Sequence, residues 1–164
     1  MFPTGGPLEV ACYCDADLGG CEETLRSTSG GLLLLSGCVV HSWSKQQPTV
    51  ALSSAEAEFT ALARGASEAL YLKNVLEELG YQVPAPVLFT DSKAAVDMTR
   101  KRVVGRAKHL GRRMFFVREL VDGGKIVVKH IAGTSNPADI HTKHVDRATL
   151  ECHRPAALGL IHSE

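Results

Sequence analysis

The sequence predicts an α/β protein in which a mixed β-sheet is covered by helices. Three observations lead to this prediction: two β-type apolar segments near the N-terminus, one well-capped helix in the middle, and short apolar runs that then alternate with helical segments. The predicted order is strand, hairpin, long helix, strand, helix, helix, strand, helix. Strands that come first and then alternate with helices favour a mixed sheet with helices on its faces.

The N-terminal third is predicted to be β-structure. Residues 8–15 form a strand that ends in polar residues, and the Gly-, Ser- and Thr-rich residues 17–29 form a loop. Residues 30–43 are rich in Leu and Val and are interrupted by Ser36-Gly37, which predicts a hairpin. Residues 45–52 then lead through a turn and a short extended run into a helix.

That helix has the clearest boundaries in the chain. Ser53 and Glu56 form a capping box, in which the Ser53 side chain accepts from the Glu56 amide and the Glu56 carboxylate reaches back to the Ser53 amide. The following residues up to Leu79 are mainly Ala, Leu and Glu, which are strong helix formers. Gly80 ends the helix, and Pro84 follows shortly after.

The C-terminal half alternates between strands and helices. The predicted elements are a buried strand over residues 86–90, a helix over 92–99, a helix over about 108–121 and a strand over 125–131. Asn136 is then placed to cap a further helix with Pro137 at its first position. The tail beyond Arg147 is expected to be partly helical.

The chain of 164 residues suits one compact domain. We expect a flexible leader over residues 1–7 and one domain over residues 8–160. The longest dense apolar run, residues 32–35, is too short to span a membrane, and no secretory signal is expected. Five cysteines without regular spacing favour free thiols in a reducing compartment, with Cys12 and Cys14 as small buried side chains on one strand face.

The formal net charge is zero, so any support for nucleic-acid binding must be local. One segment between residues 101 and 113 is strongly basic and contains no acid. Such a stripe suits a phosphate backbone, although a solvated helix face is an equal alternative. The candidate nucleic-acid-binding residues are Lys101, Arg102, Arg106, Lys108, His109, Arg112 and Arg113.

Four acidic residues lie at the ends of predicted elements. Asp15 ends the first strand and Asp91 directly follows a strand, while Glu58 and Asp139 lie in the first turns of helices. Alone, Asp15 suits a turn, Asp91 a helix cap and Asp139 a helix dipole. If the four converge, their repulsion requires cations between them, and oxygen ligands select Mg²⁺ or Mn²⁺. Two such ions can activate a water and stabilise the leaving oxygen of a phosphodiester.

Glu58 is favoured over Glu56 as a ligand. The capping box already explains Glu56. On a helix, Glu58 shares its face with the small apolar residues Ala61, Leu62 and Gly65, which are expected to face the sheet. No structural role explains a carboxylate on that buried face, so Glu58 is the better candidate ligand.

At these residues the chain resembles the ribonuclease H region of copia-type retrotransposon Pol polyproteins. The similar segments run in unbroken order within residues 11–160 and are Tyr13–Asp17, Ser27–Gly30, Ser42–Phe59, Thr90–Ser92, Lys108–Leu110, Phe116–Glu119 and Ala138–Lys143. A long collinear set of this kind is more specific than any one of its short members.

The resemblance implies a ribonuclease H-like fold, with a five-stranded mixed sheet flanked by helices. It implies an enzyme that cuts the RNA strand of RNA/DNA hybrids by two-metal-ion catalysis during reverse transcription. The implied ligands of two Mg²⁺ ions, for which Mn²⁺ can substitute, are Asp15, Glu58, Asp91 and Asp139. Asp15 is expected to contact both ions, Glu58 and Asp91 the ion near the leaving oxygen, and Asp139 the ion that activates water.

The family context implies two partners, the RNA/DNA hybrid and a reverse transcriptase domain of the same polyprotein. It also implies a cytoplasmic virus-like particle as the location, with the nucleus as an alternative. The chain departs from the family at Leu18, where Trp is common, and at His141, where an apolar or aromatic residue is usual. Cellular ribonucleases H carry a His in the loop before the final Asp; residues 132–135 hold none, which leaves His130 and His109 as weaker alternatives.

Two other functions stay open at this point. The chain can be a catalytically inactive or domesticated ribonuclease H-like module that binds nucleic acid or serves a structural role. It can also be an integrase-like nuclease that acts on DNA. The intact set of acids argues against the first function, and a final Asp in place of Glu argues against the second.

Overall fold

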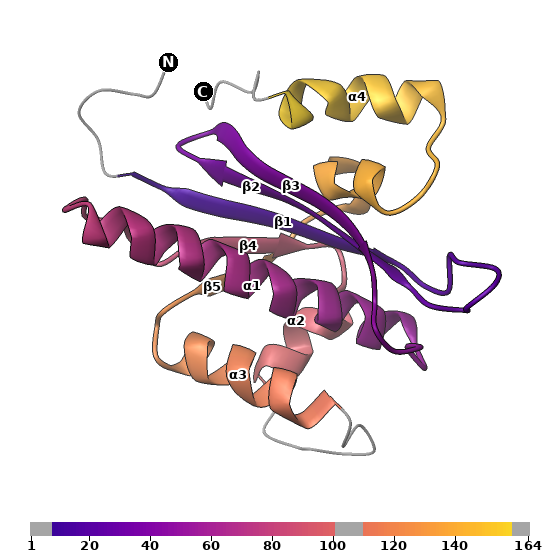
Figure 1. Cartoon of the computed structure of the whole chain (residues 1–164), viewed down its shortest axis with the longest axis horizontal. Coiled ribbons are helices and arrows are strands. Elements are labelled where there is room, and N and C mark those ends of the chain that lie inside the picture. The colour runs from indigo at the N-terminus through magenta and orange to yellow at the C-terminus, as the bar shows by residue number, and fades with distance from the viewer. Residues whose placement is uncertain (1–7, 101–109, 159–164) are drawn as a thin grey trace.

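The computed structural model describes residues 8–100 and 110–158 and confirms the predicted α/β class (Figure 1). Its main elements are β1 (Val10–Asp17), β2 (Thr28–Leu35), β3 (Cys38–Gln46), α1 (Ser54–Glu78), β4 (Val87–Thr90), α2 (Lys93–Arg100), α3 (Gly111–Asp122), β5 (Val127–His130) and α4 (Arg147–Ala157). Two short 3₁₀ helices, η2 (Gly133–Ser135) and η3 (Pro137–His141), lie between β5 and α4.

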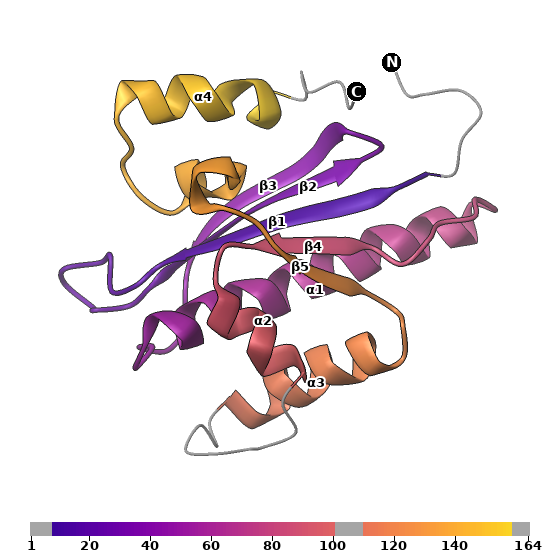
Figure 2. The same ribbon diagram turned by 180° about the vertical axis from the view of Figure 1, so that it is seen from behind.

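The five strands form one mixed sheet in the order β3-β2-β1-β4-β5. The first three strands are antiparallel neighbours, and β4 and β5 run parallel to β1. Helices α1, α2 and α3 lie on one face of the sheet, and η3 and α4 lie on the other (Figures 1 and 2). Because β1, β4 and β5 point the same way, their C-terminal ends meet at one edge of the sheet.

The predicted hairpin is confirmed, but its strands are longer than residues 30–43. Ser36 and Gly37 both have positive φ angles, 47° and 80°, as a two-residue type I′ turn requires. The extra residues of β3 are mostly exposed polar side chains, since β3 is an edge strand. They therefore carry no apolar pattern from which a strand can be predicted.

Helix α1 begins as its capping residues predict. Ser53 is extended, and its hydroxyl accepts from the Glu56 amide at 3.2 Å. The Glu56 carboxylate accepts from the amide of Leu52 at 2.9 Å, one residue before the expected partner. Glu56 is therefore fixed at the start of the helix by backbone contacts, which leaves Glu58 as the first acid free to face the sheet.

The contact between α1 and β1 forms the centre of the core. Cys12 and Cys14 are fully buried, as predicted, with their sulfur atoms 3.7 Å apart and in the thiol form. They lie under Gly65 of α1, where an added Cβ would come within 2.2 Å of the Cys14 sulfur. The absence of a side chain at Gly65 thus lets α1 approach β1 closely.

In the second half, some predicted elements differ in extent or type from those in the structure. Helix α3 starts at Gly111. Residues 101–109, which hold most of the predicted basic stripe and the start of the predicted helix, lie outside the described residues. The helix expected at Asn136 is the five-residue 3₁₀ helix η3, whose C-cap Thr142 contacts Asp15 of β1. The tail does contain a helix, α4. Residues 1–7 of the predicted leader also lie outside the described part of the chain.

Candidate active site

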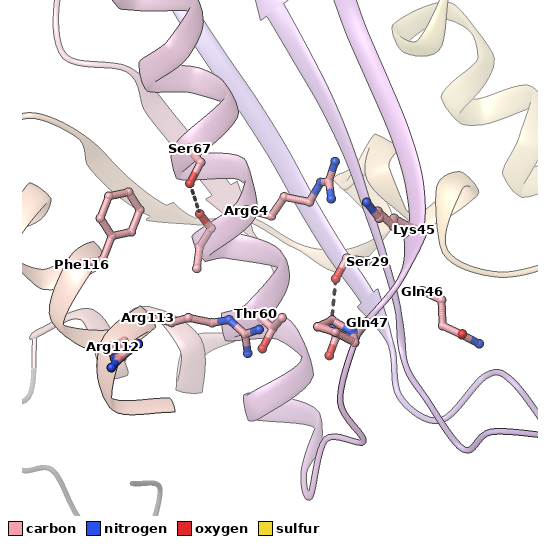
Figure 3. Close-up of a pocket in the computed structure, with 12 residues that line it drawn as sticks. Ser29, Lys45, Gln46, Gln47, Thr60, Arg64, Ser67, Arg112, Arg113 and Phe116 are labelled. Carbon is pink, nitrogen blue, oxygen red and sulfur yellow. Dashed lines mark hydrogen bonds between the residues drawn. The ribbon is translucent and has the colours of Figure 1, made fainter. Parts of the chain in front are cut away.

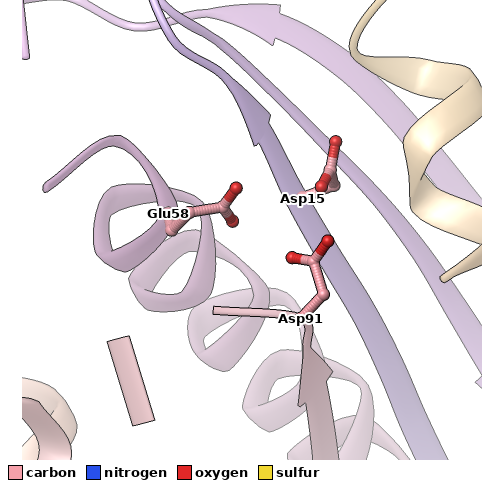
Figure 4. A group of neighbouring side chains, drawn as sticks. All are labelled: Asp15, Glu58 and Asp91. Atoms are coloured by element: carbon pink, nitrogen blue, oxygen red, sulfur yellow. The ribbon is translucent and has the colours of Figure 1, made fainter. Parts of the chain in front are cut away.

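Three of the four predicted acids meet at the sheet edge where the parallel strands end. One oxygen from each of Asp15, Glu58 and Asp91 lies within 4.8 Å of the other two (Figure 4). We call these three residues the acid cluster. Asp15 comes from β1, Asp91 directly follows β4, and Glu58 lies in the second turn of α1.

The register of the sheet explains why the two aspartates meet. Tyr13 of β1 pairs with Phe89 of β4 in a parallel arrangement. Asp15 and Asp91 each follow two residues later, so they project from neighbouring positions on the same face. Glu58 reaches them from α1, whose face with Ala61 and Leu62 is completely buried against the sheet. The sequence-based preference for Glu58 over Glu56 therefore agrees with the geometry.

The η3 segment supports Asp15 from the other face of the sheet. The Thr142 hydroxyl donates to the Asp15 carboxylate. The fully buried Asn136 donates from its side-chain amide to the Cys14 carbonyl at 3.0 Å and accepts from the Ala138 amide at 3.2 Å. Asn136 therefore caps η3, as predicted, and also ties it to β1 one residue before Asp15.

Glycine at position 30 permits this packing. Gly30 pairs with Asp15 across the β1–β2 ladder. A Cβ at Gly30 would come within 2.6 Å of Thr142 and 2.9 Å of His141. A side chain on β2 would therefore push η3 away from the sheet, and with it the hydroxyl that contacts Asp15.

Asp139 lies beside the acid cluster but is not one of its three converging members. Its Oδ1 atom is 2.5 Å from the ammonium nitrogen of Lys143. The Asp139 carbonyl also accepts from the Thr142 hydroxyl at 3.0 Å. Asp139 is thus held near Asp15 through Thr142, while its carboxylate is neutralised by a lysine from the same segment.

Burial and mutual repulsion raise the pKa values of Glu58 and Asp15 in the acid cluster. Burial, followed by the charges of Asp15 and Asp91, raises the pKa of Glu58 to about 9. Burial also raises the pKa of Asp15 to about 6, against the opposing effect of the Thr142 hydrogen bond. Negative charge at this edge is therefore costly without a cation.

The donor set fits a hard divalent cation. All the converging atoms are carboxylate oxygens, which Mg²⁺ and Mn²⁺ prefer. The Glu58 Oε2 atom is buried and has no hydrogen-bond partner. A buried carboxylate oxygen without a donor is unfavourable unless a cation or water completes it, so the residues present fit a metal site.

The basic stripe is only partly described. Arg112 and Arg113 lie in the first turn of α3. The other predicted nucleic-acid-binding residues lie outside the described residues and are Lys101, Arg102, Arg106, Lys108 and His109. No helix in the described part of the chain is long and apolar enough to cross a membrane.

Two residues at the site, Thr142 and Lys143, were given no role in the sequence-based prediction. Lys143 and Thr142 carry no sign of their role until η3 is folded against β1. His130 ends β5, as a strand residue, and its Nε2 atom is 3.0 Å from the Asp91 carbonyl oxygen. His141 packs beside Gly30, and burial lowers its pKa. Both histidines had been noted in the sequence, His130 as an alternative to the missing loop histidine and His141 as a departure from the family.

The fold matches solved ribonucleases H. The N-terminal ribonuclease H domain of a Mycobacterium tuberculosis protein superposes with a TM-score of 0.61 over 92% of this chain and 99% of that one, at 15% identity. Ribonuclease H1 of Halobacterium salinarum gives a TM-score of 0.60 over 82% and 94%, at 19% identity. LC11 ribonuclease H1, solved with an RNA/DNA hybrid, gives 0.61 over 82% and 94%, at 16% identity. The chain thus has the ribonuclease H-like fold.

Sequence comparison places the domain more narrowly. The chain is 37% identical over 140 residues to the retrovirus-related Pol polyprotein of transposon TNT 1-94 from Nicotiana tabacum, and 32% identical over 149 residues to that of transposon RE2 from Arabidopsis thaliana. These matches cover 85% and 90% of the chain but only 10% of each relative. No family model matches. The chain belongs to the copia-type retrotransposon Pol family and corresponds to about a tenth of those polyproteins.

Proposed function

We propose that this domain hydrolyses the RNA strand of an RNA/DNA hybrid with the help of two Mg²⁺ ions. The observation that carries the proposal is the convergence of Asp15, Glu58 and Asp91 at the ends of β1 and β4. Their carboxylate oxygens, together with the raised pKa values of Asp15 and Glu58, indicate a cation site. The ribonuclease H-like fold and the Pol relatives support nucleic acid as the substrate.

Each acid has a separate task in this proposal. Asp15 would contact both ions. Glu58 and Asp91 would hold the ion near the leaving oxygen, and Asp139 would join the water-side ion by exchanging its contact with Lys143. When bound, two such ions lower the pKa of a water and stabilise the leaving oxygen of a phosphodiester.

The chain itself supplies orientation and proton control. Thr142 and Asn136 fix the Asp15 carboxylate and the η3 segment before substrate arrives. Glu58 holds a proton at neutral pH in the absence of cations and gives it up when positive charge enters the cluster. Lys143, paired with Asp139, supplies one positive charge beside the acids.

The proposed partners and location rest on the membership of the Pol family. We propose an RNA/DNA hybrid as substrate and a reverse transcriptase domain of the same polyprotein as neighbour, inside a cytoplasmic particle. A solved LC11 ribonuclease H1 with this fold carries an RNA/DNA hybrid, which supports the choice of substrate. Copurification of the domain with its polyprotein in host cells tests the neighbour and the location.

Cleavage of a hybrid with a labelled RNA strand tests the activity. We expect cleavage in Mg²⁺, its loss with chelator, and a decrease of at least about a hundredfold in Asp91→Asn, because one charged ligand is lost while the shape is kept. Asp122→Asn, at the exposed end of α3, is the matched control and should cleave like the wild type. Circular dichroism shows whether both variants are folded.

The same assay separates the alternatives. Equal and negligible cleavage by the wild type and Asp91→Asn would mean that the domain is an inactive binding or structural module. Cleavage of duplex DNA in preference to the hybrid would instead indicate an integrase-like nuclease. Either result overturns the proposed function.

A further inference from the structure

One face of the sheet carries an apolar strip that crosses four strands. The register pairs one residue each from β2, β1, β4 and β5 in a single row, which is Leu34, Ala11, Val87 and Val127. The next row along β1 is Leu32, Tyr13, Phe89 and Lys129. Paired residues share a face of the sheet, and residues next to them in sequence face the other way. Because the alternate residues Cys12, Leu88 and Val128 belong to the core under the helices α1–α3, the strip lies on the face that carries η3 and α4.

The cover over this strip ends partway across the sheet. In the first row Leu34 is 6% exposed, Ala11 and Val87 are half-buried, and Val127 is 41% exposed. In both views α4 lies on the β3 side of the sheet, away from β5 (Figures 1 and 2). The apolar strip therefore continues towards β5 beyond the elements that cover it at β2.

The uncovered part of the strip forms a continuous surface. We call it the back-face patch and define it as Ala11, Tyr13, Val87, Phe89 and Val127. The rings of Tyr13 and Phe89 stack with their centres 4.8 Å apart and their planes at 17°. Single exposed apolar side chains are common on protein surfaces, but a contiguous group with an aromatic pair is typical of an interaction site.

The chemistry of the back-face patch suits a protein partner better than a nucleic acid. A polyanion would meet no cation among its five side chains, and Lys129 lies only at its border. The pocket between β3, α1 and α3 on the other side of the molecule differs in this respect, since Lys45, Arg64, Arg112 and Arg113 line it (Figure 3). An apolar surface with a charge at its rim resembles a protein–protein interface.

The back-face patch lies where the chain enters the sheet. Ala11 is the second residue of β1, and Val87 and Val127 are the first residues of β4 and β5. Asp15 follows Ala11 by four residues, which is roughly 13 Å along a strand. A domain joined to the chain before Val10 is thus placed beside the patch, and it can cover the patch while the acid cluster stays open.

The length of the relatives favours such a linked domain over a second copy of this chain. The matches cover only 10% of each Pol polyprotein, so in those relatives further domains share the same polypeptide. A linked domain binds at an effective concentration in roughly the millimolar range, and a small surface is then sufficient. An unlinked second copy needs about 800 Å² on each partner, which five partly buried side chains do not supply.

We propose that the back-face patch docks the reverse transcriptase domain of the same polyprotein. This inference rests on the proposed function, which names that domain as a neighbour but gives it no surface. The stacked rings of Tyr13 and Phe89 contact an apolar area of the partner, Val127 lies inside the interface, and Lys129 lies at its rim. The contact holds the acid cluster in a fixed position relative to the partner and leaves it accessible to substrate.

Thiol labelling tests the docking surface. Val127→Cys is prepared in this domain alone and in a longer polypeptide that also contains the reverse transcriptase domain. Labelling by a maleimide is followed by peptide mass spectrometry, which separates the new thiol from the native cysteines. We expect labelling to be at least about tenfold slower in the longer polypeptide, because a linked partner then covers the patch for more than about 90% of the time.

Val40→Cys is the matched control. Val40 is 42% exposed against 41% for Val127, and it also lies on an edge strand, but β3 and β5 are opposite edges of the sheet. Val40→Cys should therefore be labelled at the same rate in both polypeptides. Circular dichroism shows whether each variant is folded.

A charged residue in the patch should release the partner. Lys129→Cys is the reporter at the rim, and its labelling in the longer polypeptide should become about tenfold faster when Val127→Asp is added. Val40→Asp should leave the reporter unchanged. A reporter that labels at the same rate with and without Val127→Asp would overturn the proposed surface.

Two further results would also overturn the proposal. Equal labelling of Val127→Cys in the two polypeptides would mean that the reverse transcriptase domain does not cover the patch. Labelling of the domain alone that slows with increasing protein concentration would mean that a second copy of this chain covers it.

Cleavage of the hybrid is scored separately from labelling. A wild-type domain that cuts the hybrid, together with equal labelling of Val127→Cys, overturns the docking surface and leaves the proposed function intact. Slow labelling of Val127→Cys in a longer polypeptide whose wild type never cuts the hybrid overturns the proposed function and leaves the docking surface.

Discussion

At the scale of single residues, Glu58 has the most altered acidity in the site. Its folded pKa of about 9 lies above the ordinary value of 4.5, because burial and the charges of Asp15 and Asp91 disfavour its ionised form. A raised pKa means that the folded protein holds a proton that the unfolded chain loses. The contribution to stability is therefore complete below about pH 4.5 and is lost as pH rises towards 9.

We therefore expect the metal-free protein to become less stable from pH 5 to pH 9, relative to Glu58→Gln. Glutamine keeps the shape of the side chain and cannot ionise, so its variant lacks this part of the pH dependence. Thermal unfolding of both proteins in chelator across this range measures the effect. Parallel curves for the two proteins would show that Glu58 is not buried among like charges.

Thr142 gives a second prediction at this scale. Its hydroxyl donates to Asp15 and thereby lowers the pKa of that carboxyl. Thr142→Val keeps the shape and removes the donor, so the acidic limb of the pH–rate profile should move to higher pH. Thr142→Ser should restore the wild-type profile. A general loss of activity in Thr142→Val with an unchanged profile would instead indicate a purely structural role.

At the scale of elements, the approach of α1 to β1 positions Glu58. Gly65→Ala adds a methyl group where an ideal Cβ would lie 2.2 Å from the Cys14 sulfur. The gain in helix propensity of about 1 kcal/mol is smaller than the cost of about 1–3 kcal/mol expected for overpacking a buried contact. We expect Gly65→Ala to lower the free energy of unfolding by up to about 2 kcal/mol, the overpacking cost less the gain in helix propensity.

Cys14→Ala provides the matched test, because it removes the sulfur that the new methyl group meets. In denaturant unfolding, the double variant should lose less stability than the sum of the two single variants. Strict additivity would mean that Gly65 and Cys14 are not in contact and that α1 lies farther from β1.

The start of a helix or the position of a turn could be predicted wherever residues close in sequence determine it. The Ser53 cap, the Ser36-Gly37 turn and the Asn136 cap each rest on contacts between residues close in sequence, and all three are confirmed. The exposed end of β3 and the shortness of η3 were missed. An edge strand has no buried face to produce alternation, and the packing of η3 on Gly30 involves a residue more than a hundred positions away.

At the scale of the whole molecule, the fold class and the five-stranded sheet were predicted. Three of the four predicted acids converge, and Asp139 lies beside them. Asp15, Glu58 and Asp91 were recognisable because each lies at the end or on the buried face of an element with a clear pattern. Lys143 and Thr142 could not be recognised in this way. Thr142 contacts Asp15 only once η3 packs against β1, and Lys143 pairs with Asp139 in the same segment.

The central claim is that carboxylates from distant parts of the chain together bind divalent cations. Anomalous diffraction from crystals grown with Mn²⁺ tests it most directly. We predict a strong anomalous peak coordinated by oxygens of Asp15, Glu58 and Asp91, and its loss in Asp91→Asn. A well-ordered site without such a peak at saturating Mn²⁺, or a peak bound elsewhere that persists in Asp91→Asn, would contradict it.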